Sequence, residues 1–184
     1  MSAVAGRART LTVVTELRPF GTTVLRISFA VTRRLPAILG IAPLRSIYST
    51  RWTLVPTLPS GGTGRRVRPS RPYLLWESDY SAAMEPYIES FISAIGKRIA
   101  FTWASSYGFP GTRSVTRLRE YIESTSLPPG CTYSAYPDQS AAMVLSSLAV
   151  SREHPFLLDA ARDGTDEEFA VLYRGFLRRR QGDL

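Results

Sequence analysis

The chain contains very few of the side chains that build disulfides and metal centres. Among its 184 residues there is one cysteine, Cys131, and one histidine, His154. A single cysteine excludes a disulfide within the chain, which suits a reducing compartment such as the cytoplasm or a design that uses no disulfide. We expect no zinc centre of His and Cys ligands and neither a Ser/His/Asp nor a Cys/His catalytic arrangement. No cofactor is evident. A metal held by carboxylates alone stays open, as does the question whether the chain is an enzyme.

Long apolar runs are missing too. No stretch approaches the ~20 uninterrupted apolar residues that a membrane-spanning helix needs. A cleavable secretory signal also fits poorly, because no clean apolar segment is followed by a small-residue cleavage site. These absences favour a cytoplasmic protein, and they leave room for one that attaches peripherally to the inner face of the membrane.

Acidic residues are scarce in the first part of the chain. Residues 1–72 hold 12 arginines and one acid, Glu16, which gives a net charge of +11. Residues 73–184 hold 11 basic and 14 acidic residues, so their net charge is −3 and the whole chain carries +8. Lysine occurs once, at Lys97, and we attribute this preference for arginine to coding composition. The basic character therefore belongs to the N-terminal part.

We divide the chain into a basic N-terminal segment, residues 1–46, and a single α+β domain, residues 47–184. Residues 1–15 are small, polar and basic, and we expect them to be disordered. Residues 20–35 are expected to form a helix, because their apolar side chains recur at nearly helical spacing. These side chains are Phe20, Val24, Ile27, Val31 and Leu35.

Three interpretations of this helix stay open. It packs on the domain with its arginines in water, it lies on an anionic membrane surface, or it belongs to an arginine-rich transit peptide. In the second case, or with a protein partner in place of the membrane, we expect four arginines to make the contacts. They are Arg26, Arg33, Arg34 and Arg45.

Residues 73–79 form the centre of the expected domain. The apolar run 73–76 predicts a short buried strand. Glu77, Ser78 and Asp79 then offer oxygens that can cap the start of a helix. The stripe behind them predicts a helix that ends at Gly96; its members are Met84, Tyr87, Ile88, Phe91, Ile92 and Ile95. Alternation over residues 97–103 predicts a second strand, so the three elements form a βαβ unit, right-handed if its strands are parallel.

The remaining elements complete an α+β pattern. Alternation predicts strands over residues 47–55 and 131–136. Helices are expected over 115–122, after Pro137 and Asp138, and from Thr165 to the end, with His154 in a surface loop. This order is close to a ferredoxin-like, four-stranded sheet with helices on one face, plus the N-terminal basic helix and the C-terminal helices. The N-terminal segment or a second subunit, in a homodimer, would cover the other face.

Residues 56–71 are rich in Pro, Gly and Arg and predict a flexible connection between two strands. Their arginines could touch phosphates. No aromatic residue lies between them and no nucleic-acid motif accompanies them, so we do not expect nucleic-acid binding.

Four short motifs resemble those of an uncharacterised bacterial α+β family. They are STRW at 49–52, LLWESDY at 74–80, SSYGFPG at 105–111 and YSAYP at 133–137. The resemblance covers about residues 15–148 and extends to the closing helix, 169–184. It implies an α+β fold and carries no known reaction. Ferredoxin-like proteins of similar outline include small haem- or flavin-handling oxygenases that dimerise, but this link is one of fold alone.

Candidate site residues lie where strands are expected to end. Glu77, Asp79, Tyr107 and Tyr133 could converge as acids and bases in a pocket between the sheet and the helices. The alternative is structural, with the acids capping a helix and the tyrosines packing in turns. Two hypotheses follow. The first is a binding or interaction module held at a membrane or on a partner by its basic segment. The second is an oxygenase-like, small-molecule enzyme.

Overall fold

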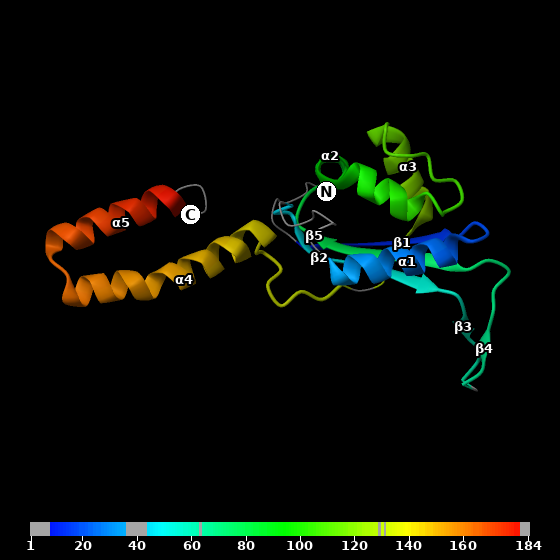
Figure 1. The fold of residues 1–184 in the computed structure, drawn as a ribbon, viewed down its shortest axis with the longest axis horizontal. Coiled ribbons are helices and arrows are strands. Elements are labelled where there is room, and N and C mark those ends of the chain that lie inside the picture. The colour runs from blue at the N-terminus through cyan, green and yellow to red at the C-terminus, as the bar shows by residue number, and fades with distance from the viewer. Residues whose placement is uncertain (1–7, 36–43, 63, 129, 131, 181–184) are drawn as a thin grey trace.

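The computed structural model describes residues 8–35, 44–62, 64–128, 130 and 132–180 (Figure 1). The strands are β1 (Arg9–Glu16), β2 (Ile47–Val55), β3 (Leu58–Pro59), β4 (Arg66–Val67), β5 (Tyr73–Tyr80) and β6 (Ser126–Leu127). The helices are α1 (Gly21–Arg34), α2 (Met84–Trp103), α3 (Val115–Thr125), α4 (Ala141–Asp163) and α5 (Asp166–Arg180). The chain is therefore an α+β protein.

Four strands build one antiparallel sheet in the order β2-β5-β1-β6. β1 is an inner strand, paired with β5 along its whole length. The expectation of disorder is therefore wrong for residues 9–15. Leu11 and Val13 alternate with threonines there and are buried, as in a strand with one face in the core. A boundary at residue 46 would separate β1 from its pairing partner.

β5 continues through the residues that we expected to cap a helix. Glu77, Ser78 and Asp79 all pair with neighbouring strands, and burial alternates along β5. Ser78 points into the core, where the Tyr87 hydroxyl donates a 2.7 Å hydrogen bond to its Oγ. A polar side chain can sit inside the sheet because it is hydrogen-bonded. Burial raises the pKa of Tyr87.

α2 does not end at Gly96, and the strand expected over residues 97–103 is the last part of this helix. Trp103 is fully buried and meets Trp76 edge-on, with 4.8 Å between the ring centroids. Burial of the indole outweighs the cost of about 1 kcal/mol for a glycine inside a helix. The expected βαβ unit is therefore absent, and all strand pairs among the described residues are antiparallel.

Aromatic rings dominate the core between the sheet and the helices. Trp76 stacks on Phe91 and on Trp52, and Tyr80 stacks on Tyr87 with 4.1 Å between the centroids. The same cluster includes side chains from α1 and α3: Leu25, Leu118, Tyr121 and Ile122. The helix predicted over residues 115–122 is confirmed as α3, and Ser114 caps its start.

Two connections differ from expectation. Residues 56–71, expected to be a flexible connection between two strands, include the short ribbon β3-β4. The strand expected over residues 131–136 is not formed by residues 132–136; Cys131 lies outside the described residues. The strand of this region is β6, which pairs with Thr12 and Val13 of β1.

The C-terminal helices α4 and α5 pack on each other as a hairpin that projects away from the sheet (Figure 1). Glu153 of α4 accepts hydrogen bonds from Arg179, at 3.1 Å, and from Arg180. These bonds, the one from Arg180 first, lower the pKa of the Glu153 carboxyl. His154 and Pro155 lie inside α4 and not in a loop as expected, and the His154 side chain is exposed.

Candidate functional site

The outer face of the sheet, opposite the core, carries both acids of β5. Because side chains alternate along a strand, Glu77 and Asp79 share this face while Trp76 and Ser78 enter the core. In the register of the sheet, Asp79 lies between Thr10 of β1 and Ser49 of β2. The position of the two carboxylates thus follows from the pleat of β5 and not from a helix cap.

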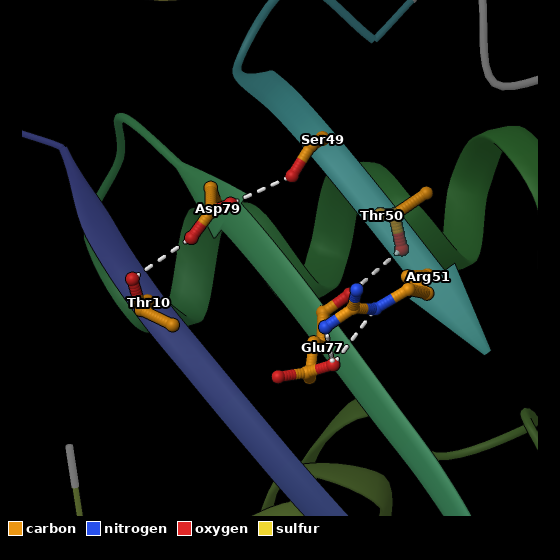
Figure 2. Close-up of polar contacts among 6 residues, drawn as sticks. All are labelled: Thr10, Ser49, Thr50, Arg51, Glu77 and Asp79. Carbon is orange, nitrogen blue, oxygen red and sulfur yellow. Dashed lines mark hydrogen bonds and ion pairs between the residues drawn. The ribbon is translucent and has the colours of Figure 1, made fainter. Parts of the chain in front are cut away.

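Hydroxyl groups from both neighbouring strands hold Asp79 (Figure 2). Thr10 donates to its Oδ1 at 2.8 Å, and Ser49 donates to its Oδ2 at 2.6 Å. Each carboxylate oxygen therefore has one protein donor and keeps lone pairs for a further one. This arrangement fixes the side chain as a hydrogen-bond acceptor.

Glu77 is held by Arg51 of β2 (Figure 2). The guanidinium donates to Glu77 Oε2 from Nε at 2.9 Å and from NH2 at 2.5 Å. The Arg51 side chain is 70% exposed, so the ion pair adds no more than about 1 kcal/mol to stability. It does neutralise the Glu77 charge locally, which leaves Asp79 as the source of net negative charge on this part of the face.

A cavity of about 640 Å³ lies over these carboxylates. We call it the sheet pocket. Its floor is the outer face of β1 and β5, and the segment after β6 forms one wall. Its lining residues are Ala8, Thr10, Thr12, Tyr48, Glu77, Asp79, Leu127, Pro128, Gly130, Thr132, Tyr133 and Ser134. The pocket is on the open face, so the expectation of a pocket between the sheet and the helices is wrong.

The sheet pocket contains three of the four predicted site residues. Glu77, Asp79 and Tyr133 line it, and Tyr107 does not. Tyr107 lies near the other end of β1, where its backbone N–H donates to Glu16 O at 2.9 Å. The Arg71 guanidinium is 4.4 Å from the centre of its ring. Tyr107 thus contributes a cation–π contact at the opposite end of the sheet.

Polar residues of β1 and of the segment after β6 were missed at this site. Thr10 and Thr12 reach the pocket only because β1 pairs with β5, and Thr132 and Ser134 only because the following segment turns back over the face. The alternation of threonines with Leu11 and Val13 was an available signal for β1. Among the described residues, no group of three or more His, Cys, Asp or Glu side chains could hold a metal ion.

A second candidate surface lies on α1. The predicted helix is confirmed, but the expected apolar stripe does not enter the core. Leu25 is buried, whereas Ile27 is 62% exposed and Phe20 is 85% exposed. The core-facing side of α1 is instead the one that carries Gly21, Leu25 and Ser28. The stripe of Phe20, Val24, Ile27, Val31 and Leu35 therefore faces solvent.

Part of this stripe borders a groove of about 410 Å³ between α1 and α2. Apolar side chains and cations line it, and Phe101 of α2 is 59% exposed. We define the basic apolar surface by its apolar members Ile27, Val31 and Phe101 and its basic members Arg34, Lys97 and Arg98. Neither residues 17–35 nor residues 90–103 contain an acid.

The four predicted contact arginines do not lie together. Arg34 is three residues after Val31 and so neighbours the exposed stripe. Arg26 and Arg33 are seven residues apart on another side of α1, since each residue turns the helix by about 100°. Arg45 is exposed in the turn before β2.

Comparisons with known proteins find nothing similar. No family model matches the chain, and no curated protein or solved structure matches it either. The two surfaces must therefore be interpreted from their own chemistry. None of the described helices is both long and apolar enough to cross a bilayer.

Proposed function

We propose that the protein is a binding module that attaches peripherally to the anionic inner face of the cell membrane. The basic apolar surface is the part that makes this contact. The observation that supports the proposal most is the outward-facing stripe of α1. Cations lie beside this stripe, and neither residues 17–35 nor residues 90–103 contain an acid. A helix packed only for stability would turn such a stripe inward.

Two forces add up at this surface. Ile27, Val31 and Phe101 would enter the boundary between headgroups and acyl chains. Each cation near an anionic leaflet contributes about 1 kcal/mol, so Arg34, Lys97 and Arg98 together contribute about 3 kcal/mol at low salt. The expected binding is reversible and weakens as salt is added.

Liposome co-sedimentation tests the proposal. The full chain should pellet with vesicles that contain phosphatidylserine and remain in the supernatant with pure phosphatidylcholine. The triple variant Arg34→Gln, Lys97→Gln, Arg98→Gln should lose about 100-fold in partition, the equivalent of about 3 kcal/mol.

The matched control removes three charges elsewhere. Arg26→Gln and Arg33→Gln lie on another side of α1, and Arg117→Gln lies on α3, so this variant should bind much more tightly than the first. Equal losses in both variants would mean that only total charge matters. Equal recovery with both lipids would instead leave an acidic protein as the partner.

A small-molecule site in the sheet pocket is a second candidate, because a cavity of about 640 Å³ gathers Glu77, Asp79 and Tyr133. The hydrogen-bond partners of Asp79 among the described residues are hydroxyls, so its charge is not neutralised by a cation there. The chemistry suits a small hydroxylated amine, whose ammonium group would meet Asp79 while its hydroxyls meet the threonines.

Calorimetry with ethanolamine as the probe tests this candidate. The wild-type chain should bind it, and Asp79→Asn should lose about 10-fold or more in affinity because the ammonium group loses its counter-charge. Glu85→Gln removes an exposed carboxylate on α2 and should leave the affinity unchanged. Equal binding by all three chains would refute a role for the pocket.

We further propose a ferredoxin-like topology and membership of the uncharacterised bacterial family that the four motifs resemble. Two observations support the topology. The strand order is β2-β5-β1-β6. The connection through α1 joins β1 to β2, the connection through α2 and α3 joins β5 to β6, and in each case another strand lies between the two. A structure determined for any chain with the same four motifs would test both proposals.

A further inference from the structure

The α4–α5 hairpin leaves much apolar surface uncovered. Residues 140–151 carry no charge, and this half of α4 is apolar on several sides. Its exposed side chains are Met143, Val144, Leu145 and Leu148. Phe156, farther along α4, is 73% exposed. A helix that is apolar around its circumference is typically buried against other chains or elements, and clustered exposed apolar side chains mark a contact surface.

The two ends of the hairpin carry opposite charge. The tip, residues 156–172, holds five acids and one arginine, a net charge of −4. The base, residues 141–155 and 173–180, holds five arginines and one glutamate, a net charge of +4. One side of α4 shows the same gradient, because Arg152 and Asp159 lie seven residues apart with the exposed Phe156 between them.

We propose that this surface is covered by a second copy of the chain, whose hairpin packs antiparallel to the first and forms a four-helix bundle about a twofold axis. In this arrangement the acidic tip of each hairpin meets the basic base of the other. Arg152 of one copy then reaches Asp159 of the other, and the two Phe156 side chains lie near the axis. Leu148 lies one turn before Arg152 and two turns before Phe156 on the same side of α4, so it belongs to the same interface.

The charge pattern of the hairpin favours a second copy of the chain as the partner that covers it. A twofold interface brings one surface against itself, so the surface must be complementary to itself when turned around. The hairpin satisfies this condition, with −4 at one end and +4 at the other. An unrelated partner would impose no such condition, and an anionic membrane would repel the tip. The proposal uses no residue of the basic apolar surface or of the sheet pocket, so it stands apart from both proposed functions.

Sedimentation equilibrium of the full chain, with two charge-reversed variants, tests the proposal. The tip variant is Asp159→Lys, Asp163→Lys, and the base variant is Arg152→Glu, Arg178→Glu. The wild type should dimerise with a Kd below about 100 μM. Each variant alone should dimerise with an affinity lower by about 10-fold or more, because like charges then meet.

An equimolar mixture of the two variants should restore the dimer as a heterodimer. In the mixture each lysine tip faces a glutamate base and each arginine base faces an aspartate tip. Weak folding of the variants cannot mimic this rescue. Asp163 also lies in the last turn of α4, where a lysine suits the helix dipole better than an acid.

The control is Glu89→Lys, Glu120→Lys, which makes the same charge change as the tip variant on α2 and α3. It should dimerise like the wild type. A wild type that is monomeric up to about 100 μM overturns the proposal. Two variants that fail to associate when mixed, or a control that is weakened as much as the tip variant, overturn it as well.

Discussion

The buried hydrogen bond from Tyr87 to Ser78 allows a quantitative test of how α2 is fixed on the sheet. Tyr87 is fully buried and donates to Ser78 Oγ at 2.7 Å. Ser78 also donates to the backbone oxygen of Ser49 at 3.3 Å. Tyr87→Phe removes one bond but leaves Ser78 with a partner, so it should cost about 1 kcal/mol. Ser78→Ala strands the phenol hydroxyl in the core and should cost about 2 kcal/mol.

The double variant Tyr87→Phe, Ser78→Ala shows whether the two hydroxyls act as a coupled pair. Once both groups are gone, no buried hydroxyl is left unpaired, and we expect a loss of about 2 kcal/mol in place of the additive ~3 kcal/mol. Urea unfolding followed by tryptophan fluorescence gives these free energies, provided that the denaturant slopes agree. A control cycle of Tyr87→Phe with Thr165→Ala, at the residue that caps the start of the distant α5, should be additive within about 0.5 kcal/mol. An additive result for Tyr87 and Ser78 would refute the bond as a coupled unit.

Three further predictions concern two glycines and the dependence of stability on pH. Gly96→Ala should stabilise the protein by about 0.5–1 kcal/mol, because α2 runs through this position and the added methyl meets only ordinary contacts. Gly108→Ala should destabilise it by about 1 kcal/mol, since Gly108 has a φ of +71°. Urea unfolding measures the stability of both variants. A loss of stability in Gly96→Ala would argue against an unbroken α2. Burial raises the pKa values of Tyr80, Tyr87 and Tyr121. The free energy of unfolding should therefore be unaffected by these tyrosines below about pH 10. Above that pH it should fall by up to about 1.4 kcal/mol per pH unit for each tyrosine, because the tyrosines ionise first in the unfolded chain. Stability that stays constant while tyrosinate absorbance rises would contradict this prediction.

Elements whose local periodicity agrees with their environment could be predicted from the sequence. β2, α1 and α3 fall close to their expected bounds because alternation or helical spacing is unambiguous there. Residues 97–103 fit both patterns. Their Ile99 and Trp103 are four apart, as on one face of a helix, and also lie on one side of a strand. Long-range packing of Trp103 against Trp76 decides between the two patterns, and local spacing does not contain that information.

Part of the candidate site could be predicted from the sequence, although its residues come together for a different reason from the one expected. The sequence places Glu77 and Asp79 between the end of a strand and the start of a helix. In the structure they share a pocket because β5 continues and turns both side chains to one face. Thr10 and Thr12 could not be predicted as site residues, because the small, polar and basic composition of residues 1–15 indicates disorder. Their role depends on strand pairing with residues far along the chain, which composition does not reveal.

The inner position of β1 has a consequence for synthesis on the ribosome. Thr10 and Asp79, which meet across the sheet, are 69 positions apart in the chain. At about 5–20 residues per second, the nascent strand waits roughly 3–14 s for its neighbour to emerge. During that interval Leu11 and Val13 have no sheet to enter, so β1 cannot start the folding of this sheet during synthesis. A chaperone at the exit tunnel would meet these two apolar side chains while they are still exposed.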